Sequence, residues 1–574
     1  MFVRVKSSPR SPRKSVQIVE SKRVGAKVRQ RVIKHIGVAN DEAELEELKL
    51  FAGSVKAKLE SDGALPLYDP DDLDVMSSTT TKKAAALKEN ADALPRREYE
   101  VNLLDLIEED RIVKGIHDIY GELYDRMNFK SVIKNPQKHT ALSKALKEIV
   151  LARVANPDSK RGSVNMLASK FGTNLNLKTV YRMMDAIDDE GIIRLNSLVL
   201  RHTKDLVNNT IDIVYFDATT LYFESFCEDE GEDAIRKNGY SKDGKFNQPQ
   251  VVLALLVTKQ GLPIGYKAFS GDTFDGHTLL PAIEEIKNEL DGLKLDKIVY
   301  VADSGMFNKV NLKALDTYEL DYIVGARIKN LPANIKKQIL NLSCYSEFDD
   351  DKKIQAINYE GKKLIVTYSH KRAKKDKADR LKAIEKLKKR LQSSSSVKSQ
   401  LSHNGYKKYL QLQSKEETDK ECDLSITLNE DKIKEDEAWD GLKGILTNNT
   451  TLSNEELICQ YANLWQVEES FRITKHDLKI RPIYHFKPSR VKAHLAISFI
   501  AYTLVRHLEY RVKLLHKKLS VQKIRELLLS VQCSIFYDSR TDKKYSMPSH
   551  LNSEQKKIYK LMKVTPQQRA QKIK

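Results

Sequence analysis

Three acidic residues stand where a carboxylate could carry out chemistry. Asp217 interrupts an apolar, β-branched and aromatic run in segment 211–224, Asp303 closes a second such run, and Glu468 lies in the helical pattern of 461–475. A carboxylate beside a sheet core is costly unless a partner or a metal ion neutralises it. Two aspartates on strands and a glutamate on a helix can hold two divalent metal ions for phosphoryl transfer. Carboxylates suit Mg²⁺, with Mn²⁺ as a substitute, whereas the scattered Cys and His residues do not.

The composition favours a polyanionic partner. The 574-residue chain has a net charge of +19 and 41% hydrophobic residues, which indicates a globular protein that binds nucleic acid or an acidic membrane. The first residues have no signal-peptide core, and the apolar stretch Leu495–Val505 is too short to span a bilayer. Five cysteines without a CxxC pair favour reduced thiols. We therefore expect a cytoplasmic protein with no membrane partner.

The N-terminal segment is strongly basic. Residues 1–36 hold eleven Lys or Arg residues and one acid, in short alternating runs separated by turns. This pattern predicts a small β-meander, whose charge is about equally well explained by a solvated face or by a phosphate-binding arm. An amphipathic helix at Asp41–Glu60 completes the expected module 1–60, and the composition of 61–100 is typical of a linker.

Residues 101–206 have a helical pattern throughout. Helices are expected at Leu103–Tyr124, His139–Ala155, Arg161–Phe171 and Leu177–Ile187. The turn around Gly172 resembles a helix-turn-helix, so this segment is a possible DNA-binding domain. Ordinary bundle packing gives the same pattern, and site-specific DNA reading is the minority hypothesis.

The remaining segments predict an α/β domain interrupted by an insertion. In 207–330 strands come first, followed by helix, strand, helix and strand, and strand character returns in 439–535. This order fits a mixed sheet of the ribonuclease H kind. Segment 331–438 is expected to be an inserted subdomain in which the basic run Lys371–Arg390 forms a surface helix, either solvated or DNA-binding. Residues 536–574 are expected to be a polar tail with a basic end.

Several motifs together resemble one family. The spacing Tyr461-x2-Leu464-x3-Glu468-x6-Lys475 is similar to the Y-x2-R-x3-E-x6-K signature of DDE transposases from bacterial insertion sequences, in group four and its sixteen-thirty-four branch. Further matches are Tyr215-Phe-Asp217-Ala-Thr-Thr, Gly239-Tyr-Ser-Lys, Gly261-Leu-Pro-Ile-Gly-Tyr266, Ala302-Asp303-Ser-Gly, Asp440-Gly441, Thr447-Asn448, Val467-Glu-Glu-Ser-Phe-Arg472 and Arg481-Pro-Ile-Tyr-His485. The resemblance covers roughly 210–510, and ordered motifs are a far stronger signal than a single one.

The resemblance implies roles for individual residues. Asp217, Asp303 and Glu468 would be the catalytic, metal-binding residues for cleavage of element ends and strand transfer to target DNA. Tyr461 and Lys475 would contact the transposon-end DNA. Leu464 replaces the arginine of the signature, and Arg472 could take over part of its phosphate contact. The matched motif also places Arg481 and His485 among the DNA-binding candidates. The resemblance further implies a homodimer on paired ends and a nucleoid-associated protein of a bacterium or archaeon.

Helical geometry distinguishes Glu468 from its neighbour. If 461–475 is one helix turning about 100° per residue, Leu457, Leu464, Val467, Phe471 and Leu478 form a buried stripe. Tyr461, Glu468, Arg472 and Lys475 then lie along a polar edge of that stripe, and Glu469 faces solvent. We therefore expect Glu468 to be the third metal ligand.

Two other functions remain open at this point. A metal-dependent nuclease on the same fold would cut DNA without joining strands. A non-catalytic DNA-binding regulator would bind without cutting, although the presence of all three acids argues against it. Short inverted repeats beside the gene would favour transposition.

Overall fold

The computed structural model describes residues 101–574 except 209–210, 232, 241–243, 245–246, 290–297, 307–308, 394–406, 415–423, 516–518 and 574. Nearer the N-terminus it describes 2–8, 11–24, 27–39 and scattered positions between 45 and 56. The predicted linker 61–100 and most of the predicted helix Asp41–Glu60 lie outside the described residues.

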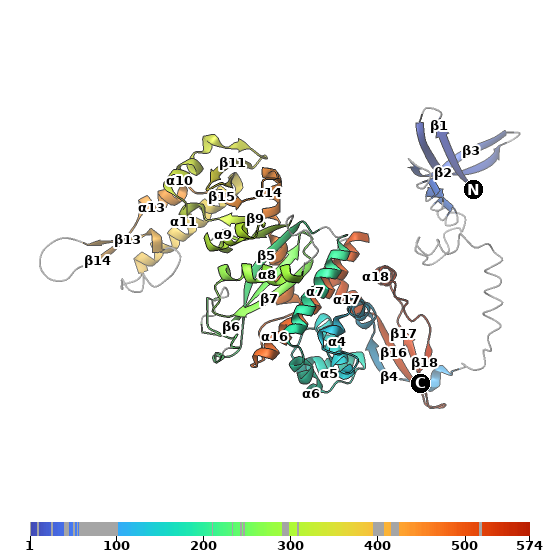
Figure 1. Ribbon diagram of the computed structural model, residues 1–574. Helices are drawn as coiled ribbons and strands as arrows, with labels where there is room; N and C mark the ends of the chain where they lie inside the picture. Colours follow the sequence, from blue (N-terminus) through green and yellow to red (C-terminus); the bar gives the residue numbers. More distant parts are fainter. Residues whose placement is uncertain are drawn as a thin grey trace.

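The centre of the molecule is a mixed sheet. Five of its strands run in the order β7-β6-β5-β8-β9; their bounds are β5 (Ile213–Tyr222), β6 (Gln250–Thr258), β7 (Pro263–Ser270), β8 (Val299–Ala302) and β9 (Asp321–Ala326). Strands β5, β6 and β7 are antiparallel, whereas β8 and β9 run parallel to β5 (Figure 1). Three antiparallel strands followed by two parallel ones form the ribonuclease H arrangement, so the predicted fold class is confirmed.

Both faces of the sheet are buried, because successive strand residues point to opposite sides. Val214 and Phe216 belong to a core under the helices α8 (Leu279–Glu289), α9 (Lys309–Thr317) and α10 (Ala333–Leu340). On the other face, Ile213 and Tyr215 belong to a core that contains residues of α14 (Asn454–Ala462), α15 (Trp465–Arg472) and α16 (Pro488–Leu515). Two covered faces explain why these strands are nearly continuous apolar runs.

Segment 331–438, predicted as an inserted subdomain, extends this sheet at its edge. Strands β10 (Ser346–Glu347), β11 (Lys352–Tyr359) and β12 (Lys362–Ser369) continue its edge, because β12 pairs with β15 (Leu442–Thr447) and β15 pairs with β9. The sheet therefore has nine strands. Within the described part of 331–438, the hairpin of β13 (Leu410–Ser414) and β14 (Leu424–Leu428) forms a separate two-stranded sheet.

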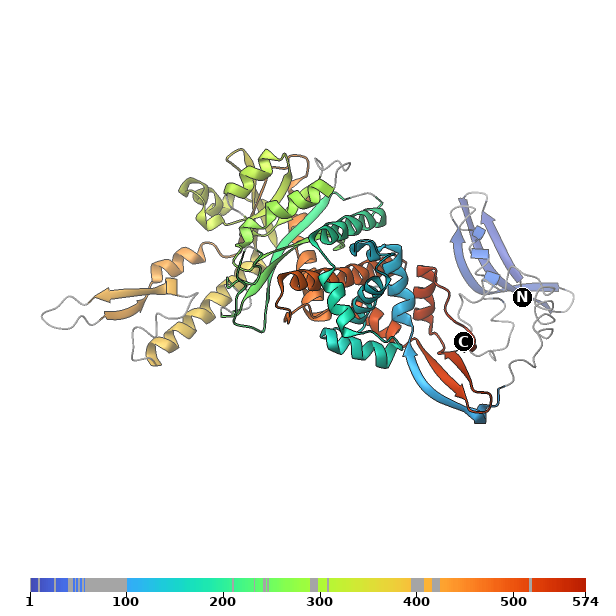
Figure 2. The same cartoon turned by 60° about the horizontal axis from the view of Figure 1, so that its bottom comes forward.

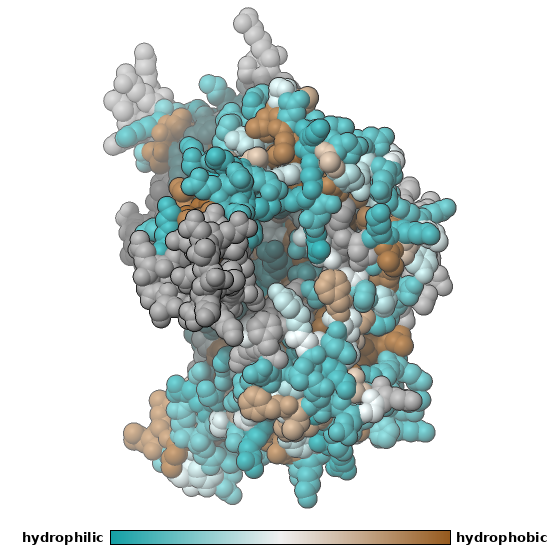
Figure 3. Space-filling model, turned by 90° about the vertical axis from the view of Figure 1, so that its left-hand side faces the viewer, coloured by the Kyte–Doolittle hydropathy of each residue, from teal (hydrophilic) through white to brown (hydrophobic). Residues whose placement is uncertain are grey.

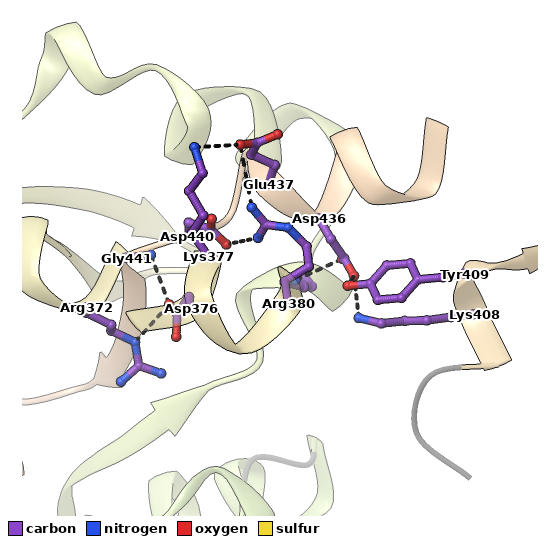
Figure 4. Close-up of polar contacts among 11 residues, drawn as sticks. Arg372, Asp376, Lys377, Arg380, Lys408, Tyr409, Asp436, Glu437, Asp440 and Gly441 are labelled. Carbon is purple, nitrogen blue, oxygen red and sulfur yellow. Dashed lines mark hydrogen bonds and ion pairs between the residues drawn. The ribbon is translucent and has the colours of Figure 1, made fainter. Parts of the chain in front are cut away.

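The predicted basic helix is α11 (His370–Ser393), and it is docked by specific polar contacts. Figure 4 shows Arg380, whose side chain is buried, pairing with Asp440 and with Glu437 of α13 (Glu430–Glu437), the latter at 3.5 Å. Asp376 accepts a hydrogen bond of 3.0 Å from the backbone N–H of Gly441, whose φ of +81° suits glycine. These contacts dock helix α11 on the fold, while the surface at this end is mostly hydrophilic (Figure 3).

In the region 101–206 a 3-10 turn at Leu103–Asp105 comes first, and the longer helices lie beyond residue 113. Its helices include α3 (Glu122–Arg126), α4 (Thr140–Ala155), α5 (Lys160–Phe171), α6 (Leu177–Asp185) and α7 (Asp189–Leu206). The predicted helix-turn-helix shape is present as α5 and α6, joined at Gly172 with a φ of +62°. Helix α6 packs against α4 and α16 (Figure 2). Whether it reads DNA stays a prediction.

The first half of the predicted helix Leu103–Tyr124 is instead the strand β4 (Leu106–Val113). It pairs with β16 (Gln532–Asp538), followed by β17 (Lys543–Pro548) and β18 (Gln571–Ile573). Together with α17 (Val521–Leu529) and α18 (Ser553–Met562), these strands correct the predicted polar tail 536–574. A partner more than 400 residues away overrides the local helical pattern of 106–113.

The N-terminal module is the predicted meander. Strands β1 (Phe2–Ser8), β2 (Ser11–Val24) and β3 (Lys27–Ala39) form an antiparallel sheet with its own small core. None of the helices in the described part of the chain is long and apolar enough to cross a membrane.

We predict that α18 contributes to stability as a core element. Ile558 is 1% exposed in the core shared with α16 and α17, so Ile558→Ala should lower the free energy of unfolding by about 2–5 kcal/mol. The exposed Lys556 on the same helix is the matched control, and Lys556→Ala should change it by no more than about 0.5 kcal/mol. Thermal denaturation measures both, and equal effects would show that residues beyond 536 act as a tail.

Candidate active site

The pairing of two parallel strands places two aspartates at neighbouring positions. Phe216 on β5 lies opposite Ala302 on β8, and the next residues are Asp217 and Asp303. Neighbouring strands lie about 4.8 Å apart. Asp217 lies two residues after Tyr215, and Asp303 lies two residues after Val301. Residues two apart on a strand share a face, and Tyr215 and Val301 belong to the same core. Both aspartates therefore belong to the face that α14, α15 and α16 cover.

The two carboxylates have different surroundings. Asp217 lies within β5, is half-buried, and accepts a hydrogen bond of 2.8 Å from the N–H of Ala218 through Oδ1. Asp303 follows the end of β8 and is exposed. Its Oδ1 accepts a hydrogen bond of 3.4 Å from the hydroxyl of Tyr461. Asp303 is thus hydrogen-bonded to a side chain of α14, one of the helices that cover this face, whereas Asp217 is hydrogen-bonded to the backbone of its own strand.

Tyr461 lies on α14 and is buried against the sheet, which corrects its predicted place on a polar edge. It is 7% exposed, and its hydroxyl lies so close to Gly325 of β9 that a Cβ at that position would overlap it. Burial raises the pKa of Tyr461, and the charges of Asp303 and Glu468 raise it further. The phenol therefore stays protonated and can donate to Asp303.

The predicted single helix is interrupted, so one angular projection does not hold across it. Helix α14 ends at Ala462, α15 begins at Trp465, and a π-helix follows at Ile473–Asp477. The residues of the apolar stripe are buried as predicted, whereas the residues of the predicted polar edge differ from one another in exposure. Glu468 is exposed in the first turn of α15, where the helix dipole favours a negative charge.

Glu469 is the more enclosed of the two glutamates, which corrects its expected solvent position. Its carboxylate accepts two hydrogen bonds of 2.6 Å from Arg472. Arg472 also lies 3.5 Å from Asp477, and this pairing, chiefly with Glu469, raises the pKa of Arg472. The guanidinium that was predicted to bind DNA is held by carboxylates of its own helix layer.

Lys475 reaches the strand that carries Asp217. Its Nζ donates a hydrogen bond of 2.6 Å to Oγ1 of Thr219, two residues beyond Asp217 on β5. Residues two apart on a strand share a face, so the Lys475 ammonium and the Asp217 carboxylate lie on the same side of the sheet.

Two basic residues beside the acids were missed at the sequence level. Lys443 of β15 lies over the ring of Tyr461, with Nζ 4.7 Å from the ring centroid. The pKa of Lys443 is lowered by removal of water and by repulsion from Arg372, while Asp303 and Glu468 oppose this. Arg372 and Lys443 line a hollow of about 280 Å³ with Tyr461. The signals in the sequence were the matched Asp440-Gly441 pair, which precedes Lys443, and the basic run Lys371–Arg390, which contains Arg372.

The negative charges of Asp303 and Glu468 thus both affect the pKa of the same two side chains, Tyr461 and Lys443. The donor set of Asp217, Asp303 and Glu468 is entirely carboxylate oxygen, which suits Mg²⁺ or Mn²⁺. Among the residues that the structure describes, no three His, Cys, Asp or Glu side chains are close enough to enclose a metal ion. The three acids fit such an ion by ligand type and strand register, and they do not form a closed cluster.

Arg481 and His485 lie beside the far end of β5. The N–H of Ile483 donates to the carbonyl of Tyr222 at 3.4 Å, and the Arg481 guanidinium lies 5.4 Å from the centroid of the Tyr222 ring. Burial, together with the nearby charges of Lys160, Arg490 and Arg153, lowers the pKa of His485 to about 3. His485 is therefore neutral, and its ring contacts Tyr181 and His494.

Comparisons with known proteins agree with this geometry. A family model described as the transposase DDE domain matches residues 208–504, just over half of the chain. The model of the IS1634 family transposase N-terminal domain matches residues 3–64. A search of the curated proteins found no match.

Solved structures give weaker similarities. A piggyBac transposase synaptic complex with hairpin DNA is 11% identical with a TM-score of 0.36, covering 72% of this chain and 76% of that chain. A pre-cleavage Mos1 transpososome is 9% identical with a TM-score of 0.14, covering 48% of this chain and 74% of that one. TM-scores this low carry no argument about function.

We predict that Gly325 is required because Tyr461 occupies the space of its side chain. Gly325→Ala should lower the free energy of unfolding by about 1–3 kcal/mol through overpacking. Tyr461→Phe removes the oxygen that the new methyl group would meet, so the double variant should recover at least about 0.5 kcal/mol relative to the sum of the single variants. Denaturation of all four proteins measures this coupling, and strictly additive losses would contradict the contact.

Proposed function

Because the chain belongs to the DDE transposases of the IS1634 type, we propose that it cleaves DNA at the ends of its insertion sequence and transfers the freed strand to target DNA. The observation that carries the proposal is the register of β5 and β8, which sets Asp217 beside Asp303. Glu468 belongs to the helix layer over that face and influences the same groups as Asp303. Two neighbouring carboxylates on one face of a sheet, with a third on the helix layer over that face, suit phosphoryl transfer on a polyanion.

Asp217, Asp303 and Glu468 would hold Mg²⁺, or Mn²⁺ in its place. When bound, these ions activate a water molecule or a 3′-hydroxyl and stabilise the leaving oxygen. Tyr461 has a positioning role in this proposal, because its protonated hydroxyl orients Asp303. The exposed Glu468 is free of the pairing that occupies Glu469, which favours Glu468 as the third ligand.

Basic side chains around the carboxylates would bind DNA phosphates. Lys475 lies beside Thr219 on the Asp217 side, and Lys443 lies over Tyr461 on the Asp303 side. Two cations on either side of the acids would hold a strand across them. Arg472 is engaged with Glu469, so a phosphate contact from Arg472 would require that pair to open.

The molecule would act as a homodimer, since an element has two ends and each set of three acids serves one end at a time. The two rival functions differ from this proposal in one product each. A nuclease would leave cut ends unjoined, and a DNA-binding regulator would leave DNA intact.

We predict that Asp217→Asn, Asp303→Asn and Glu468→Gln each reduce cleavage and strand joining by about a hundredfold or more, because each removes a charged metal ligand. Binding of end DNA should remain close to that of the wild type. A gel assay with cognate ends measures cleavage and joining, with Mg²⁺ or Mn²⁺ present and after chelation.

Glu469→Gln is the matched control, since it makes the same chemical change one residue away and should leave cleavage nearly unaltered. Loss of cleavage in Glu469→Gln but not in Glu468→Gln would show that the wrong glutamate is assigned. Cutting without joining by the wild type would favour the nuclease.

We also predict a steep salt dependence of DNA binding. The logarithm of the binding constant should fall linearly with the logarithm of salt concentration, by about 0.9 for each phosphate contacted on duplex DNA. Lys475→Gln should reduce this slope by about one contact. Lys313→Gln makes the same charge change at an exposed position of α9, on the opposite face of the sheet, and should leave the slope unaltered. Anisotropy titrations measure the slope, and a flat response in the wild type would be inconsistent with phosphate binding.

A further inference from the structure

A second basic hollow lies away from the three acids. It has a volume of about 310 Å³ and is bounded by the end of α4, the start of α5, the segment 479–485 and α16. The side chains that matter most are Arg153, Lys160, Arg481, His485 and His494. We call it the α5 pocket.

Two cations of the α5 pocket are buried, and no acidic side chain among the described residues pairs with them as a counter-charge. Arg153 is 4% exposed and Lys160 is 5% exposed, and neither forms an ion pair with an acidic side chain in the described part of the chain. Nη1 of Arg153 donates to the carbonyls of Leu478 and Lys479 at 2.8 and 3.2 Å, while its buried Nε has no hydrogen-bond partner. A buried unpaired cation is costly, so such a pair of residues suggests a site for an anion.

The histidines of the pocket do not supply that counter-charge. Nε2 of His494 lies 2.9 Å from the carbonyl of Ile480, which requires a proton on Nε2. Its Nδ1 is then the acceptor for the Lys160 ammonium, 3.3 Å away. Burial lowers the pKa of both His485 and His494, so both are neutral. Burial and the neighbouring Arg153 also lower the pKa of Lys160, and an anion in the pocket would offset both effects.

The start of α5 adds to the positive potential. Lys160–Phe171 is a twelve-residue helix whose first turn borders the pocket. The one acid that lines the pocket is Asp158, and its Oδ1 accepts a hydrogen bond of 2.6 Å from the N–H of Ser159. The charge of Asp158 lies at the helix terminus, where the helix dipole favours it. It also partly offsets the lowering of the pKa of Arg153 by burial, although the two side chains form no ion pair.

The α5 pocket is connected to the candidate active site by one strand. Arg481 lines the pocket, and two residues later the N–H of Ile483 donates to the carbonyl of Tyr222, which lies five residues beyond Asp217 on β5. At about 3.3 Å per residue this separation is roughly 17 Å along the strand. DNA advances about 3.4 Å per nucleotide along its axis, so one strand crossing both sites would span about five nucleotides.

We propose that the α5 pocket binds a phosphate group of the DNA strand that passes the three acids, with Lys160 and Arg153 as its buried cations. The inference rests on the proposed function for the identity of the strand. The chemistry it assigns is a phosphate anion, which a DNA backbone or free inorganic phosphate could supply.

The test is Lys160→Met, which removes the charge and keeps the length of the side chain. Because the charge is buried and unpaired, DNA-free Lys160→Met should melt at the same temperature as the wild type or higher. Its affinity for end DNA should fall about tenfold, and its salt slope by about 0.9. Cleavage at saturating DNA should persist. Lys170→Met is the matched control, since Lys170 is exposed at the other end of α5 and should alter neither property.

The outcomes separate this proposal from the proposed function. A lower melting temperature with unchanged DNA affinity in both Lys160→Met and Lys160→Gln would overturn it, because Lys160 would then be structural. If inorganic phosphate raises the melting temperature of the wild type while Lys160→Met binds DNA normally, the pocket takes free phosphate and the DNA assignment fails. If the wild type never cleaves but Lys160→Met still loses DNA affinity, the pocket stands and the proposed function fails.

Discussion

The parallel pairing of β5 with β8 is the constraint on which the site depends. A shift of one residue in this register would turn either aspartate to the opposite face of the sheet. The register is fixed because both faces are buried, with Tyr215 and Val301 in one core and Phe216 and Ala302 in the other. The cost of exposing these side chains therefore also holds Asp217 and Asp303 on the side of the helix layer.

The sequence was sufficient for the features that depend on local pattern. The strands around Asp217 and Asp303 are long apolar runs, and their order along the chain predicts the ribonuclease H arrangement that the sheet has. The basic run 371–390 has apolar residues at helical spacing, and it is helical as α11. The ordered motifs around Asp217, Asp303 and Glu468 are sufficient to indicate the family.

Features that depend on distant partners could not be predicted in this way. Strand β4 has a local pattern compatible with a helix, and its pairing with β16 decides its conformation. The break between α14 and α15 moves Tyr461 from a polar edge into the core, because a projection at 100° per residue assumes one continuous helix. Lys443, Arg153 and Lys160 belong to no spacing pattern, and only the fold brings each beside its neighbours.

The sheet of β4, β16, β17 and β18 joins residues 106–113 to residues 532–573. During synthesis, β4 leaves the ribosome more than 400 residues before the strand with which it pairs. Contacts of such large sequence separation close late, since the loop between them must first be ordered. The nascent chain must therefore carry β4 with an open edge until translation is nearly complete, and an unpaired strand edge promotes association with other chains. A product that stops before residue 532 never closes this edge, which makes truncated copies targets for chaperones and proteases.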